Sequence, residues 1–60
     1  MKKKYKDFTI EKMNTGNWWI VKKDGDVEAL VLSEEESRRV IWLKTGRGEP
    51  ITDAMMEIVS

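Results

Sequence analysis

Three parts of the chain are predicted to be β-strands: the first alternates apolar and polar residues with a period of two, whereas the second and third are apolar on both faces across their centres. In the first part, Phe8 and Ile10 share one face of the predicted strand. The second and third parts are separated by Asp24-Gly25, a dipeptide that favours a tight two-residue hairpin turn. We therefore predict a three-stranded antiparallel meander, with strands at residues 5–13, 17–23 and 26–32.

The residues after the third predicted strand indicate a helix. Ser33 followed by Glu36 matches the capping box, in which each side chain accepts a hydrogen bond from the backbone of the other residue. The helix is predicted over 34–45 and to end at Gly46, a typical residue after a helix C-terminus. Residues 52–59 suit either a short helix or a further strand.

These elements predict an α+β fold: a three-stranded antiparallel meander followed by one packed helix and a short C-terminal helix or strand. Residues 1–60 are too few for more than one domain, so we expect a single small β-β-β-α domain. The basic segment at residues 1–4 is expected to be frayed.

Both faces of the predicted sheet carry apolar side chains. Trp18 and Trp19 are adjacent, and neighbouring side chains on a strand point to opposite faces. In the third strand, Val27, Ala29 and Val31 share one face, and Leu30 and Leu32 share the other. Because one helix can cover only one face, we expect the second face to be covered by the C-terminal segment, by another copy of the chain or by a partner.

The predicted helix has one broad apolar arc formed by Val40, Ile41 and Leu43 together with Ser37. Trp42 falls outside this arc and lies one turn after Arg38, where a cation–π contact is geometrically possible. Two interpretations remain open: the C-terminal segment covers Trp42, or Trp42 is an interaction site.

Composition limits the chemistry available to the chain. It has no cysteine and no histidine among 60 residues, which excludes disulfides, thiol nucleophiles and the commonest general base. The carboxylates of residues 34–36 are those of a solvated first helical turn, and Asp24 and Asp26 are those of a hairpin. We expect no enzymatic activity, no metal site and no cofactor. No apolar run is long enough to span a membrane, so the cytoplasm is the expected location.

Charge is distributed unevenly along the chain. Residues 1–23 carry seven lysines against two acids, giving +5, whereas residues 24–60 carry four basic residues against nine acids, giving −5. The two parts can attract each other within one fold, or the first part can form a basic contact face. Lysines interleaved with aromatic residues on a sheet are typical of platforms for single-stranded nucleic acid; the candidate residues are Lys4, Lys6, Lys12, Lys22 and Lys23.

Two resemblances add to this interpretation. The run from Leu30 to Glu36, a strand that ends in a Ser-Glu-Glu helix cap, resembles the sheet-to-helix junction of positive-cofactor-four-like proteins, which implies single-stranded DNA binding. Trp18, Trp19 and Trp42 in a charge-rich chain without Cys or His resemble small phage-encoded inhibitors, such as anti-CRISPR proteins and uracil-DNA glycosylase inhibitors. That resemblance implies a compact, non-catalytic protein that often dimerises and acts by contact.

The sequence therefore predicts a non-enzymatic small binding module of phage or mobile-element type. We expect it to inhibit or regulate a protein partner by direct contact, as a homo-oligomer, in the cytoplasm of the host cell. The alternative is single-stranded nucleic-acid binding through a lysine and aromatic sheet face. The candidate residues for the partner or oligomer interface are Tyr5, Trp18, Trp19, Arg38 and Trp42.

Overall fold

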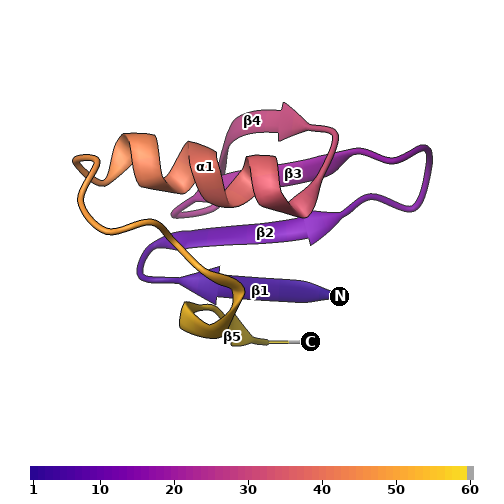
Figure 1. Ribbon diagram of the computed structural model, residues 1–60. Helices are drawn as coiled ribbons and strands as arrows, with labels where there is room; N and C mark the ends of the chain where they lie inside the picture. Colours follow the sequence, from indigo (N-terminus) through magenta and orange to yellow (C-terminus); the bar gives the residue numbers. More distant parts are fainter. Residues whose placement is uncertain (60) are drawn as a thin grey trace.

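One antiparallel sheet of five strands, with a helix across one face, forms the fold (Figure 1). The computed structural model describes residues 1–59. The strands lie side by side in the order β4-β3-β2-β1-β5, and every paired neighbour is antiparallel. In chain order the elements are β1 (Lys2–Tyr5), β2 (Phe8–Lys12), β3 (Trp19–Lys23), β4 (Asp26–Val31), α1 (Glu34–Lys44), the 3-10 helix η1 (Asp53–Met55) and β5 (Glu57–Ile58).

The α+β class is confirmed, but the prediction of three strands is wrong, because the sheet has five. Residues 5–13 are divided by a tight turn in which Tyr5 pairs with Phe8 and Lys6 adopts a φ of 53°. Residues 1–4, which we expected to fray, instead contain most of β1, which is hydrogen-bonded to β2 on one side and to β5 on the other. A run of lysines carries no apolar alternation, so the pattern could not indicate this strand.

The C-terminal segment contains both a short helix and a strand. One turn of 3-10 helix, η1, precedes the two-residue strand β5, where Ile58 lies opposite Lys3. The backbone N–H of Val59 donates to the carbonyl oxygen of Lys2 at 2.9 Å. The two ends of the described chain are therefore neighbours in the sheet, as Figure 1 shows.

The hairpin predicted at Asp24-Gly25 is confirmed. Both residues have positive φ, 51° and 87°, as a type I′ turn requires. Beyond this turn the register between β3 and β4 shifts, so that Val27 lies opposite Lys22 while Ala29 lies opposite Val21. This β-bulge adds one residue to β4, and it moves Val27 to the face opposite Ala29 and Val31, contrary to our expectation.

Helix α1 begins and ends close to the predicted positions. The Ser33 hydroxyl oxygen accepts a hydrogen bond from the backbone N–H of Glu36 at 3.1 Å. The Glu36 carboxylate accepts from the backbone N–H of Leu32, also at 3.1 Å, one residue earlier than in a standard capping box. Gly46, with a φ of 99°, follows the C-cap Thr45.

The apolar core lies between α1 and the covered face of the sheet. Ile10, Val21 and Ile41 are fully buried at its centre. On α1, Ser37 and Ile41 are buried and Val40 and Trp42 are partly buried, whereas Leu43, which we expected on the inner arc, is exposed. Trp42, which we expected outside this arc, packs against the core and lines a groove with Pro50 and Ile51 of the segment after α1. The buried apolar residues are Phe8, Ile10, Val21, Ile41, Ile51 and Met56.

Candidate functional site

The two faces of the sheet have different surroundings. Helix α1 contacts β2, β3 and β4 on one face. Within residues 1–59, no helix or strand covers the opposite face, which we call the open face. Paired residues on neighbouring strands point to the same face, so the register assigns each strand residue to one of the two faces.

Two rows of paired side chains cross the open face. Each row begins with lysine on β1 and ends with an apolar residue on β4. Charged groups therefore gather at the β1 side and apolar groups at the β4 side. The first row is Lys4, Thr9, Lys22 and Val27, and the second is Lys2, Glu11, Ile20 and Leu30.

The β4 side of the open face exposes large apolar side chains. Val27 is 57% exposed and Leu30 is 52% exposed, although both lie on a regular strand. Trp18 and Leu32 lie one residue outside β3 and β4, continue the same alternation and are also exposed. We call Trp18, Ile20, Val27, Leu30 and Leu32 the apolar patch.

The β1 side of the open face holds a shallow hollow of about 540 Å³. Lysine side chains at positions 2, 4 and 6 line it together with Thr9. Asp7 and Asp24 line the same hollow, and Glu57 lies opposite Lys4. The lysines are therefore interspersed with carboxylates, and this end of the face carries both signs of charge.

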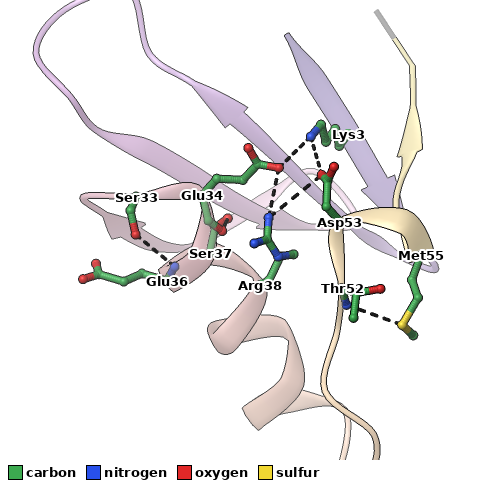
Figure 2. A network of polar contacts seen from close by, with 9 residues as sticks. All are labelled: Lys3, Ser33, Glu34, Glu36, Ser37, Arg38, Thr52, Asp53 and Met55. Atoms are coloured by element: carbon green, nitrogen blue, oxygen red, sulfur yellow. Dashed lines mark hydrogen bonds and ion pairs between the residues drawn. The ribbon is translucent and has the colours of Figure 1, made fainter.

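A cluster of ion pairs lies on the covered side of the sheet (Figure 2). The Lys3 ammonium donates to Glu34 Oε1 at 2.6 Å and to Asp53 Oδ1 at 2.5 Å. Arg38 Nη1 lies 3.0 Å from Glu34 Oε1 and 3.9 Å from Asp53 Oδ1. Three elements, β1, α1 and η1, are thereby joined through four side chains. The cluster also links the basic first part of the chain to its acidic second part.

Hydrogen bonding within this cluster shifts two pKa values in opposite directions. The hydrogen bond to Asp53, and then that to Glu34, raises the pKa of the Lys3 ammonium above its ordinary value of 10.5. The hydrogen bond from Lys3 lowers the pKa of the Asp53 carboxyl below 3.8. Both groups are therefore charged at neutral pH, and the arrangement stabilises ionised partners rather than a neutral acid or base.

The residues predicted for a partner interface do not share one surface. Trp18 lies beside the open face, whereas Tyr5 and Trp19 have the register of the covered face and pack against the core. Trp42 packs against the core, and its Nε1–H donates to the carbonyl oxygen of Gly48 at 2.9 Å. Arg38 faces Glu34 and Asp53.

The lysines predicted for nucleic-acid binding are also divided between surfaces. Lys4 and Lys22 share the open face on either side of Thr9. Lys12 and Lys23 have the register of the covered face, and the Lys23 ammonium lies 5.7 Å from the centre of the Phe8 ring. Lys6 lies in the first turn, with its ammonium 5.4 Å from the centre of the Tyr5 ring.

A second concavity lies between α1 and the returning C-terminal segment. This open groove of about 780 Å³ is lined by Arg39, Trp42, Pro50 and Ile51 among other residues. Glu35, Glu36 and Asp53 also line it, so it too carries both signs of charge.

Sequence reasoning missed two kinds of residue on the open face. Lys2 was assigned to a frayed end, and Val27 was placed on the same face as Ala29 and Val31, which the structure shows to be the covered face. The bulge places the Val27 side chain on the open face, and it arises from the pairing of β3 with β4. The sequence of one strand alone does not indicate such a bulge. Leu30 and Leu32 could be identified from the sequence, because alternation along the third predicted strand places both on the face opposite Ala29 and Val31.

The fold and its surfaces define a small α+β protein with one covered and one open sheet face. Among residues 1–59, no three His, Cys, Asp or Glu side chains are grouped to hold a metal ion. None of the described helices is both long and apolar enough to cross a membrane. Comparison with known protein families, with curated proteins and with solved structures finds no match for this chain.

Proposed function

We propose that this protein is a non-catalytic binding module that acts by direct contact with another protein through the apolar patch on its open face. Inhibition or regulation of that partner is the expected consequence, as for the small phage-encoded inhibitors that the chain resembles in composition. The apolar patch is a better candidate than the predicted aromatic set, because Tyr5, Trp19 and Trp42 already pack against the core.

One observation carries this proposal: the described chain exposes more large apolar side chains than it buries. Six apolar side chains form the buried core, whereas ten large ones are exposed. Scattered exposed apolar residues are normal on any protein, but a contiguous group on one face indicates an interaction site. Ile20 and Leu30 are direct cross-strand partners, so the patch is contiguous across β3 and β4.

The shape of the patch favours a protein over a small molecule. Small-molecule sites are concave and enclose most of the ligand. The patch lies on the surface of a sheet, and the two concavities described above lie elsewhere and are open. A broad apolar surface with a charged rim is typical of protein interfaces.

Site-specific photo-cross-linking in the cells that naturally make the protein tests this proposal. A photoreactive amino acid is introduced at Leu30 or, as a matched control, at Leu43, which is an exposed leucine of α1 outside the open face. We expect a discrete protein adduct from position 30 that is weaker or absent from position 43, and that disappears when Ile20→Lys is added. Equal adducts from both positions, or none from position 30, would overturn the proposal.

The second candidate is single-stranded nucleic-acid binding at the β1 side of the open face. The hollow lined by Lys2, Lys4 and Lys6 supports it, and Trp18 at the far corner supplies one aromatic ring. Binding to phosphates weakens steeply with salt. Fluorescence anisotropy with labelled oligonucleotides at low and high salt tests it: Lys4→Gln should weaken binding more than Lys12→Gln does. No binding at low salt excludes this candidate.

A further inference from the structure

We propose that the outer edge of β1 is a second binding site, which takes an extended acidic segment of a partner protein in place of β5. In such a complex the partner's segment adds to the sheet as a strand, so that backbone hydrogen bonds supply affinity and alternate side chains supply specificity. This edge lies at the opposite side of the sheet from β4 and the apolar patch. The inference therefore goes beyond the proposed function and does not rest on it.

The strand that occupies this edge in the structure is short and buries little surface. Among the described residues, β5 pairs with β1 at Glu57 and Ile58, and Val59 adds a backbone hydrogen bond to Lys2. Glu57 is exposed, Ile58 is 63% exposed and Val59 is 44% exposed. Segments with few buried apolar side chains open locally at a lower free energy than the whole fold. A competing strand therefore displaces β5 at a small cost.

The partner has to displace only the last residues of the described chain. Ile51 and Met56, which precede β5, are each 8% exposed and belong to the core. The hydrogen bond from Lys3 to Asp53 joins η1 to β1 (Figure 2). Both anchors lie before residue 57, so release of β5 leaves the core covered.

The chain's own segment shows which chemistry this edge accepts. Lys2, Lys3 and Lys4 are consecutive on β1, and they alternate between the two faces of the sheet. On the covered side, Asp53 accepts a hydrogen bond from Lys3 at 2.5 Å. On the open face, Glu57 lies opposite Lys4. Because opposite charges on neighbouring strands attract, a strand with carboxylates at matching positions complements this edge.

One position on this edge is not matched by the chain's own strand. Val59, which carries no charge, lies beside Lys2. It also borders the hollow that is lined by Lys2, Lys4 and Lys6. A carboxylate in place of Val59 would lie on the same face as Glu57, two residues away, and beside these ammonium groups. We therefore expect the partner's segment to carry acids at alternate positions, opposite Lys4 and Lys2.

The other edge of the sheet does not fit the same partner. β4 is the last strand on that side, and its ladder with β3 is interrupted by the register shift beside Lys22. Bulges of this kind protect an edge against pairing with another chain. β4 also carries Asp26 and Glu28, and like charges on neighbouring strands are destabilising. An acidic segment therefore adds at β1 rather than at β4.

Fluorescence anisotropy with the full chain and a labelled peptide of residues 52–59 tests this inference. Val59→Pro in the protein removes the N–H that donates to the carbonyl oxygen of Lys2. Alternate N–H groups of an antiparallel strand face its neighbour, so Ile58→Pro removes an N–H that points away from β1 and is the matched control. We expect Val59→Pro to bind the peptide about two- to tenfold more tightly than the wild type does. Ile58→Pro should bind as the wild type does.

The same probe tests the charge preference of the edge. In the peptide, Val59→Glu should tighten binding by up to about fivefold at low salt. The combination of Asp53→Asn and Glu57→Gln in the peptide should weaken binding. In the protein, Leu30→Lys should leave binding unchanged, so a failure at this edge and a failure of the apolar patch are distinguishable.

Three outcomes contradict the inference. The first is an absence of peptide binding to Val59→Pro, or equal binding of the acidic and the amide peptides. The second is a change in amide chemical shifts, on addition of the peptide, that is confined to β4 instead of Lys2–Tyr5. The third is a wild-type dimer that Val59→Pro abolishes, because it would identify the segment of a second copy, rather than a partner protein, as the occupant of this edge.

Discussion

Lys3 and Asp53 are fifty positions apart in the sequence, and the Lys3 ammonium donates a hydrogen bond to Asp53 Oδ1 at 2.5 Å. Lys3 lies on β1, and Asp53 opens the 3-10 turn that leads into β5. This contact joins β1 to the segment that leads into β5, and β5 pairs with β1 directly beside it. A lysine in a run that we expected to fray is thus one of the few buried polar residues.

The two shifted pKa values predict how stability depends on pH. The pKa of Asp53 is lowered below 3.8, so its contribution is full above about pH 3.8 and is lost as the pH falls through the folded value. The pKa of Lys3 is raised above 10.5, so its contribution is full below about pH 10.5 and is lost as the pH rises through the folded value. Urea denaturation across this range should show a plateau at neutral pH that declines at both ends.

Replacing Lys3 by methionine should destabilise the fold at neutral pH. The substitution removes both ion pairs and leaves Glu34 and Asp53 with Arg38 as their shared cation. The acid decline in stability should also become smaller, since Asp53 loses the group that chiefly lowers its pKa. Lys12→Met, an exposed lysine of β2, is the control and should change stability by no more than about 0.5 kcal/mol. Equal effects of the two substitutions would show that the Lys3 cluster is not stabilising.

The hairpin glycine should be more sensitive to substitution than a loop glycine of similar exposure. Gly25 has a φ of 87°, whereas the φ of Gly48 lies outside the left-handed region, and an added methyl group meets no atom within 4 Å at either position. Gly25→Ala should therefore cost about 1–2 kcal/mol from backbone strain alone. Gly48→Ala should be neutral or stabilising by up to about 1 kcal/mol. Chemical denaturation of the two variants side by side measures the difference.

The centre of the core should tolerate truncation poorly. Ile10 is fully buried and lies between Lys3 and Val21 in the sheet. Ile10→Ala should cost about 2–5 kcal/mol, which is much of the roughly 3–9 kcal/mol expected for a chain of this length. Leu43→Ala on the exposed side of α1 should cost far less. If thermal melts give the two variants the same transition temperature, the assigned core is wrong.

The sequence correctly predicted the features that are determined by residues close together in the chain, namely the hairpin turn and the start of α1. Asp24-Gly25 gave the hairpin because few other dipeptides adopt two consecutive positive φ angles easily. Ser33 and the acids after it gave the start of α1. These features depend on backbone geometry and hydrogen bonds within a few residues, so a single sequence is sufficient to predict them.

Features that depend on long-range pairing were missed. The hydrophobic pattern does not indicate β1, because Lys3, which points to the covered face, is a charged residue. Its charge is neutralised by Glu34 and Asp53, which lie 31 and 50 positions away in the sequence. Val27 changes face because β4 has one residue more than β3 across the bulge. In both cases the deciding partner lies on another element, which the hydrophobic pattern of one strand does not describe.

The sequence by itself determined that the sheet has two apolar faces and that one helix follows it. It did so because strand periodicity assigns side chains to alternate faces without reference to the rest of the chain. Only the tertiary structure decided which apolar groups remain exposed: the helix and the returning C-terminal segment bury Trp19 and Trp42 in part, while Val27 and Leu30 stay open. Exposure is a property of what packs against a residue, so the candidate surface moved from the aromatic residues to the apolar patch of the open face.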